Sequence, residues 1–191
     1  MYPKLPELIK YLKSLEATKS IFLVTNGQEP DMIQRLQDED ALPTQLYLST
    51  NAADYDSFLK INKPKYDDSW QRWNKTLGML KHLDTRTVLR ITLIRNYNDQ
   101  KEMIPVFASM LKQASPHFIE IKSYMHIGRS TNRLEHSNML EMDEVRKFSE
   151  EIAKQSQIFS IMDESLVSRI VILQNNHRVI DRWISAYANT N

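Results

Sequence analysis

The sequence contains no cysteine among its 191 residues. This absence excludes disulfide bonds, thiolate nucleophiles, and any zinc or iron–sulfur site that takes its ligands from cysteines of this chain. Glycine is scarce too, since Gly27, Gly78 and Gly128 are the only three. So few glycines exclude a glycine-rich phosphate-binding loop, because the GxGxxG and Walker motifs need several glycines within a few residues.

The sequence also lacks long apolar runs and a strong net charge. No apolar stretch approaches the roughly 20 residues that span a bilayer, and the N-terminus has no apolar signal-peptide core. We therefore expect a cytoplasmic protein without membrane contact. The net charge of +1 excludes a general attraction to nucleic acid but leaves room for a local basic patch. Hydrophobic residues at 41% and charged residues at 26% predict one soluble domain over residues 1–191.

Short β-prone runs alternate with helical patterns along the chain. Strands are predicted at 20–25, 45–49, 86–95 and 117–123, and helices at 3–17, 29–37, 54–61, 67–82, 100–113 and 142–155. Two further strands, at 158–162 and 168–173, would form an antiparallel edge, before a tail that is either a final helix or irregular. Alternating strands and helices predict parallel strands, in either an open doubly wound sheet or part of a β/α barrel.

Polar side chains follow each predicted parallel strand. Because the carboxyl ends of parallel strands share one edge, we expect one rim built from the segments 25–26, 49–51, 92–98 and 122–133. The richest segment is 116–140, where a strand feeds a loop, 124–138, that carries cations, histidines and an aromatic residue. In contrast, Trp70 and Trp73 at helical spacing indicate core packing rather than a base-stacking surface.

Several of these residues have two interpretations. Ser49 and Asn51 either hydrogen-bond a ribose or cap the next helix. Strand alternation places Arg90 on one face with Thr92, where Arg90 would need Glu120 as an ion-pair partner.

The cations and histidines of the 116–140 segment have alternatives as well. Lys122 either forms an imine with a carbonyl substrate or binds an anion electrostatically, and we favour the electrostatic role. His126 and His136 lack a third ligand at metal spacing, which argues against zinc. Arg129 and Arg133 are the best candidates for phosphate contacts; the alternative is a solvated loop in which Arg133 pairs internally with Glu135 or Glu120.

Six segments recur together in one family, in this order: LVTNG (23–27), PTQLYLS (43–49), RTVLRITLIRNYND (86–99), HFIEIKSYMHIGRSTNRL (117–134), NML (138–140) and DESLVSRIVILQN (163–175). With them the chain resembles the later part of 4-demethylwyosine synthase, the radical S-adenosylmethionine (SAM) enzyme of wyosine biosynthesis in tRNA. The block KSYMHIG…NRL…NML followed by DES…SR is the specific part, whereas TNG alone is weak. The resemblance covers nearly all of the chain and weakens after about Arg178.

The resemblance implies a partial (β/α)6 TIM-like barrel that binds SAM and a 4Fe–4S cluster. Residues 1–140 would form the barrel units, 141–178 a helix and β pair, and 179–191 a tail. The family is a lyase that joins a two-carbon unit from pyruvate to N1-methylguanosine at position 37 of phenylalanine tRNA. Implied SAM contacts are Thr25, Asn26, Ser49, Asn51, Thr92, Arg95, Tyr124 and His126. Lys122 would be catalytic, and Lys122, Arg129 and Arg133 would contact the anticodon loop.

The departures from the family are equally informative. The CxxxCxxC-type cluster motif and the glycine-rich GGEP-like stretch are missing. Asn51 stands where an acidic residue is frequent, Asn96 where glycine is usual, and Arg129 where tyrosine is common. We therefore expect an N-terminally truncated sequence that is inactive alone. The alternatives are a non-catalytic tRNA-binding module, or half of a split protein with a separate cluster domain, and a cofactor-free aldolase using Lys122.

Overall fold

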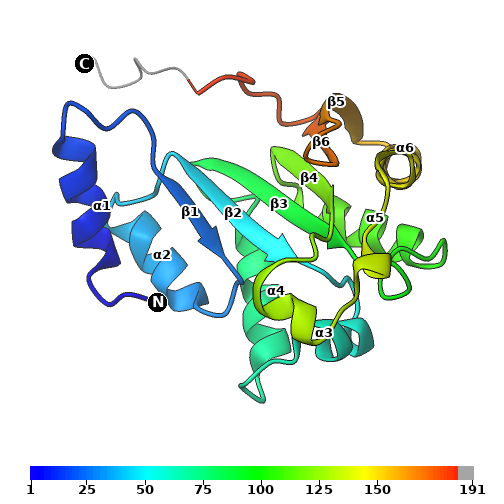
Figure 1. Cartoon of the computed structure of the whole chain (residues 1–191). Coiled ribbons are helices and arrows are strands. Elements are labelled where there is room, and N and C mark those ends of the chain that lie inside the picture. Colours follow the sequence, from blue (N-terminus) through cyan, green and yellow to red (C-terminus); the bar gives the residue numbers. More distant parts are fainter. Residues whose placement is uncertain (185–191) are drawn as a thin grey trace.

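The computed structural model describes residues 1–184, which form a six-stranded mixed sheet with helices (Figure 1). The first elements are α1 (Leu5–Ser14), β1 (Phe22–Thr25), α2 (Pro30–Asp38), β2 (Gln45–Thr50), α3 (Tyr55–Asn62), α4 (Ser69–Met79) and β3 (Arg86–Leu93). They are followed by α5 (Met103–Ala114), β4 (Phe118–Ser123), the 3₁₀ turns η1 (Gly128–Asn132) and η2 (His136–Asn138), α6 (Met142–Ser156), β5 (Phe159–Ser165) and β6 (Ile170–Asn175).

The strand order is β1-β2-β3-β4-β6-β5. The first four strands are parallel and follow one another in chain order, whereas β6 runs antiparallel to both β4 and β5. This confirms four parallel strands with an antiparallel pair at the edge. It also brings the carboxyl ends of β1 to β4 to one side of the sheet, as the polar pattern at the strand ends predicts.

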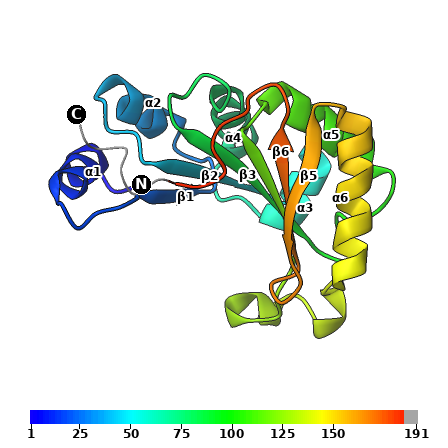
Figure 2. The same ribbon diagram turned by 90° about the horizontal axis from the view of Figure 1, so that it is seen from above.

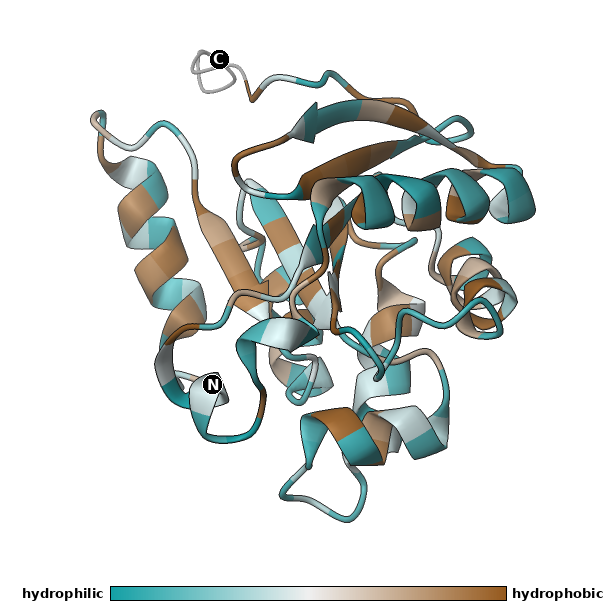
Figure 3. Ribbon diagram, turned by 45° about the vertical axis from the view of Figure 1, so that its right-hand side comes forward, coloured by the Kyte–Doolittle hydropathy of each residue, from teal (hydrophilic) through white to brown (hydrophobic). Residues whose placement is uncertain are grey.

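In the part of the chain that the structure describes, helices cover one face of the sheet only. Side chains of one parity along the strands, such as Leu48, Leu89 and Ile119, are fully buried and pack against α2, α4, α5 and α6. Figures 1 and 2 show these four helices on the same side of the sheet, and in Figure 3 the visible side of α6 is mostly hydrophilic. Residues of the opposite parity, such as Tyr47 and Lys122, remain half-buried. A doubly wound sheet carries helices on both faces, so that alternative is wrong.

The predicted tryptophan packing is confirmed for Trp73, which is 1% exposed. Its ring stacks on that of half-buried Trp70 at 5.2 Å between centroids, and the ring of Phe58 lies 5.9 Å from Trp73. These aromatic side chains join α3 and α4 beneath the carboxyl ends of β1 and β2. They give the rim a rigid base.

Several helices are shorter than predicted at their ends. The helix expected from residue 100 begins at Met103, because the preceding turn is held by side chains. Asp99 accepts a hydrogen bond from the backbone N–H of Asn96 at 2.8 Å, and Asn98 accepts one from that of Ile94 at 2.7 Å. Asparagine and aspartate often stabilise turns in this way, in competition with a helix.

The described part of the tail, 176–184, contains no helix and runs back across the uncovered face of the sheet (Figure 2). The guanidinium of Arg86 donates hydrogen bonds to the carbonyl oxygens of Asp181 at 2.5 Å and Arg182 at 2.9 Å. The expected final helix is therefore absent up to residue 184, and residues 185–191 lie outside the described part. Within residues 1–184, no helix has the length and apolar character needed to cross a bilayer.

Candidate functional site at the strand ends

Two neighbouring pockets open at the carboxyl ends of the parallel strands. The larger, of about 750 Å³, is lined by Thr25, Asn26, Ser49, Asn51 and Arg133 among others. The smaller, of about 210 Å³, shares Asn51 and Arg133 with it and adds Thr92 and Tyr124. The structure therefore brings residues from all four predicted strand ends to one site.

The exit of β1 is a tight turn that glycine makes possible. Gly27 has φ +78°, and a Cβ added to it would lie 2.8 Å from Cδ1 of Leu48. Thr25 accepts a hydrogen bond from the Gly27 N–H at 3.1 Å, and Thr76 donates one to the Gly27 carbonyl at 2.8 Å. Asn26 is exposed and lines the larger pocket. Asn26 also takes part in the turn, because its Oδ1 accepts a hydrogen bond from the Gln28 N–H at 3.3 Å.

The exit of β2 carries two polar side chains, Ser49 and Asn51, and the amide of Asn51 donates a hydrogen bond to Oδ1 of Asn62 at 3.4 Å. The carboxylate of Asp54 caps α3 by accepting a hydrogen bond from the Ser57 N–H at 2.9 Å. Ser49 and Asn51 therefore do not cap this helix, which removes one of their two interpretations. Asn51 is anchored through its backbone carbonyl, which accepts a hydrogen bond from Asn98 at 2.8 Å. Both side chains line the larger pocket.

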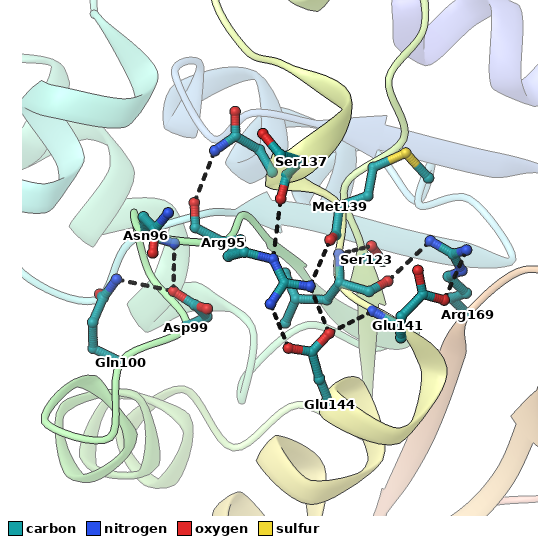
Figure 4. A network of polar contacts seen from close by, with 12 residues as sticks. Arg95, Asn96, Asp99, Gln100, Ser123, Ser137, Met139, Glu141, Glu144 and Arg169 are labelled. Carbon is teal, nitrogen blue, oxygen red and sulfur yellow. Dashed lines mark hydrogen bonds and ion pairs between the residues drawn. The ribbon is translucent and has the colours of Figure 1, made fainter.

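Arg95 at the exit of β3 is directed away from the pockets. Its guanidinium binds both carboxylate oxygens of Glu144, at 2.5 and 2.6 Å, and the carbonyl oxygens of Ser137 and Met139 (Figure 4). It lines neither pocket. The nearby guanidinium lowers the pKa of Glu144. The predicted contact of Arg95 with SAM thus lacks geometric support, because this side chain joins the 124–138 loop to α6.

The exit of β4 has a buried tyrosine at its centre. Tyr124 is 5% exposed and lines the smaller pocket, and its hydroxyl bonds to Nδ1 of His126 at 3.2 Å and to Ser130 at 3.1 Å. The rings of His126 and His136 lie 6.1 Å apart. In residues 1–184 no group of three histidine or acidic side chains could hold a metal ion. His126 lines neither pocket, and its contact with the Tyr124 hydroxyl shows that it supports this tyrosine.

The three cations predicted to contact tRNA lie in different places. Arg133 lines both pockets. Arg129 is exposed on η1, outside them. Lys122 pairs in register with Thr92 and is half-buried on the uncovered face of the sheet. In the described residues none of the three forms an ion pair, so the suggested pairings of Arg133 with Glu135 or Glu120 are wrong.

The predicted pair between Arg90 and Glu120 is confirmed. Nε of Arg90 lies 2.7 Å from the Glu120 carboxylate, and the guanidinium lies over the ring of Tyr47 at 4.5 Å. Burial and the charge of Glu120 raise the pKa of Tyr47. This group lies on the uncovered face, below the pockets and in line with Lys122.

A buried histidine lies at the opposite, amino end of the sheet. Nδ1 of His117 accepts a hydrogen bond from the backbone N–H of Thr87 at 3.1 Å. Burial, with repulsion from Arg178 and Arg86, lowers the pKa of His117 to about 4. The ring is therefore neutral at pH 7 and joins β3 to β4 far from the pockets.

Sequence reasoning missed several residues of the pocket walls, above all Gln28, Lys60, Lys63 and Lys65. Oε1 of Gln28 is buried without a hydrogen-bond partner in residues 1–184, although its amide donates to the Ser69 carbonyl at 3.1 Å. The lysines carried a signal, because three of them fall within residues 60–65 directly after a strand exit and a short helix.

A similar fold is found in part of a radical SAM enzyme. The fold is similar to that of coproporphyrinogen III oxidase (HemN) from Escherichia coli, with a TM-score of 0.54 over 88% of this chain and 39% of that chain. At 12% sequence identity, this likeness concerns the fold alone.

The sequence then identifies the family. A family model described as wyosine base formation matches residues 113–175. The tRNA 4-demethylwyosine synthase of Methanocaldococcus jannaschii is 40% identical over 95% of this chain and 54% of its own length, and that of Pyrococcus abyssi is 35% identical over 92% and 50%. The chain belongs to the family of the tRNA 4-demethylwyosine synthases, and it spans about half the length of these curated relatives.

Solved structures of this family agree. A structure of TYW1 with a lysine–pyruvate adduct bound superposes with a TM-score of 0.81 at 38% identity, over 94% of this chain and 54% of that chain. The crystal structure of archaeal TYW1 gives a TM-score of 0.73 at 34% identity with the same coverage.

Proposed function

We propose that this chain is the substrate-side part of a radical SAM lyase that modifies tRNA, built as a partial (β/α)6 barrel. The reaction joins a two-carbon unit of pyruvate to N1-methylguanosine at position 37 of phenylalanine tRNA and gives 4-demethylwyosine. The observation that carries the proposal is the pair of pockets, because six of the eight predicted SAM contacts line them: Thr25, Asn26, Ser49, Asn51, Thr92 and Tyr124.

The pocket walls fit SAM chemically. Asn26, Ser49 and Asn51 offer hydrogen-bond donors and acceptors to a ribose or an amino-acid group. The unpartnered, buried Oε1 of Gln28 would accept a hydrogen bond from an ammonium or a hydroxyl group, and a buried acceptor without a partner is costly unless a ligand satisfies it. When bound to a radical SAM enzyme, SAM supplies a reactive carbon radical. The residues of this chain would bind SAM and shield its reacting part from water.

A 4Fe–4S cluster does not fit this chain. It has no cysteine, and no three-ligand group occurs within residues 1–184. We therefore assign no step to a cluster bound here and expect the chain by itself to be inactive. This observation also favours a second candidate function, a non-catalytic tRNA-binding module or the half of a split protein that works with a separate cluster domain.

Pyruvate would be bound by Lys122. On the uncovered face Lys122 pairs in register with Thr92, two residues along the strands from the Arg90–Glu120 pair. Two roles stay open: electrostatic binding of the carboxylate, which we favour, and an imine with the keto group, in line with the lysine–pyruvate adduct bound in the related TYW1 structure. Borohydride trapping with pyruvate separates them, because borohydride reduces an imine on Lys122 to a stable adduct. Lys122→Arg is the control, since arginine retains the positive charge but forms no reducible imine.

The tRNA would approach the open side of the pockets, where Arg133 and Arg129 contact phosphates of the anticodon loop. The target base has to leave its stack to reach a pocket, as in other enzymes that act on a nucleobase. Gel-shift titration with phenylalanine tRNA should show weaker binding for Arg129→Ala and Arg133→Ala. Unchanged binding of both variants would remove this loop from the interface.

A complementation assay tests the reaction itself. The chain is mixed with the half of the Methanocaldococcus jannaschii enzyme that lies outside the match, and both are reconstituted anaerobically with iron and sulfide. With SAM, reductant, pyruvate and methylated phenylalanine tRNA, nucleoside mass spectrometry should detect 4-demethylwyosine only when both polypeptides are present.

Three other outcomes would revise the proposal. A stable 4Fe–4S spectrum from the chain alone would contradict the claim that it cannot hold the cluster. Specific tRNA binding without product from the pair would favour the non-catalytic module. Calorimetric titration with SAM is the third measurement, because Asn51→Ala should weaken binding, and unchanged affinity would exclude Asn51 as a SAM contact.

A further inference from the structure

The cations around the two pockets form a basic rim in a nearly neutral protein. Among the described residues, the smaller pocket is lined by Lys60, Lys63 and Arg133 and by no acidic side chain. The larger has Lys63, Lys65 and Arg133, and Glu29 is the one carboxylate that residues 1–184 contribute to it. Since the whole chain carries 25 cationic and 24 acidic side chains, the walls of these two pockets are more cationic than the chain as a whole.

The three lysines lie on a segment that the fold holds in a defined place. Lys60 is in the last turn of α3, and Lys63 ends this helix in the left-handed conformation, with φ 45° and its N–H bonded to the Leu59 carbonyl. Pro64 follows and cannot continue a helix. The chain is thereby turned across the rim, so that Lys63 lines both pockets and Lys65 the larger one.

These lysines are available to bind an anion. Lys60, Lys63 and Lys65 are exposed, and in the described part of the chain none of them forms an ion pair. Some other surface cations are held by carboxylates, such as Arg72 by Asp68 at 2.8 Å and Lys75 by Asp31 at 2.7 Å. Lys60 instead lies over the ring of Tyr97, 5.3 Å from its centroid.

Exposed aromatic rings accompany the lysines. Tyr55 is 49% and Tyr66 is 52% exposed, and together with Lys63, Lys65 and one carboxylate, that of Asp67, they line a third, shallow hollow of about 490 Å³. The guanidinium of Arg72 lies 5.0 Å from the centre of the Tyr66 ring and supports it. Exposed tyrosines interleaved with cations suit unpaired RNA, whose bases stack on aromatic rings while its phosphates bind lysines.

We propose that residues 55–66, the α3 surface, form a second contact for RNA, facing Arg133 across the pockets: Lys60, Lys63 and Lys65 bind phosphates, and Tyr55 and Tyr66 stack on unpaired bases. The inference rests on the proposed function, which supplies tRNA as the polyanion, and adds a surface to it. RNA held from both sides would present a flipped base to the pockets between them.

Salt-dependent binding of phenylalanine tRNA to the full chain tests the lysines. For Lys63→Gln/Lys65→Gln we expect about tenfold weaker binding near 0.1 M salt, and a slope of log K against log salt that is less negative by about 1.5, because each lost phosphate contact removes about 0.7 to 0.9. The matched control is Lys81→Gln/Lys112→Gln. Both lysines are exposed. Lys81 follows α4 and Lys112 lies in the last turn of α5, near the amino ends of β3 and β4 and therefore at the end of the strands opposite to the pockets.

Base stacking is tested with Tyr66→Leu, which should weaken binding of tRNA about tenfold but leave binding of a fully paired RNA duplex unchanged. If the salt dependence of tRNA binding has the same slope for Lys63→Gln/Lys65→Gln as for the control variant, the phosphate contacts are overturned. If Tyr66→Leu weakens binding of tRNA and of the paired duplex equally, the base stacking is overturned. In either case specific tRNA binding by the wild-type chain would leave the proposed function intact. If the wild-type chain does not bind tRNA, both the proposed α3 contact and the proposed function are contradicted.

Discussion

The turn after β1 allows the sharpest test of the structure, through Gly27→Ala. The methyl group would have to be accommodated at φ +78°, which costs roughly 1 kcal/mol for an alanine. It would also lie 2.8 Å from Cδ1 of Leu48 and 3.1 Å from Cδ1 of Trp73, both in the core. Such overpacking costs about 1–3 kcal/mol, because Trp73 is fixed between other aromatic rings.

The two costs together predict a loss of about 2–4 kcal/mol in the free energy of unfolding. For a chain of this size the midpoint of thermal unfolding should fall by roughly 5–15 °C, measured by far-ultraviolet circular dichroism. Gly78→Ala is the matched control, because Gly78 lies within α4 and its added Cβ meets nothing within 4 Å. That substitution should raise stability by about 0.5–1 kcal/mol. A Gly27→Ala variant as stable as the wild type would refute the tight turn and its packing.

Three further predictions concern charged and titratable groups. His117 has a pKa near 4 in the fold and about 6.5 when unfolded, so the unfolded state binds its proton more tightly. The free energy of unfolding should therefore fall by about 2 kcal/mol from pH 7 to pH 5 because of this residue. Urea unfolding of His117→Asn should show a weaker pH dependence. Glu120→Ala leaves the guanidinium of Arg90 without its partner in a half-buried place, and should destabilise by about 2 kcal/mol in urea, whereas a loss below a few tenths would contradict the pair. Glu144→Gln should cost about 1 kcal/mol at pH 7 and speed amide hydrogen exchange in residues 128–139, because Arg95 would no longer hold that loop against α6. The lowered pKa of Glu144 means that this contribution is present above about pH 4.5 and is lost in the wild type as the pH falls further, so the two proteins should converge in stability at low pH.

Local patterns were enough to locate the strands, the helices and the rim. Apolar runs and helical spacing predicted every strand and α-helix of the described fold within a few residues, but not the two 3₁₀ turns. Strand alternation placed Arg90 on one face with Thr92, and the need of a buried guanidinium for a partner suggested Glu120, which the register of β3 and β4 confirms. The polar segments after the strands converged because parallel strands end at one edge.

Side-chain direction at the strand ends did not follow from the same patterns. Arg95 appeared as suitable for a ligand as Asn51, yet a carboxylate 49 positions later in the chain, that of Glu144, draws its guanidinium away from the pockets. Asp54, and not Ser49 or Asn51, caps α3. Each outcome depends on a competition between partners, which only their positions in space can decide.

The sequence by itself determined the α/β class, the family resemblance and the lack of cluster ligands, because composition, periodicity and motif order are properties of the chain alone. Only the tertiary structure decided that the helices cover one face of the sheet, and that lysines 60, 63 and 65 meet Arg133 around two pockets. The physical reason is distance. Segments some 70 residues apart share an electrostatic field only after the sheet has brought their strand ends together.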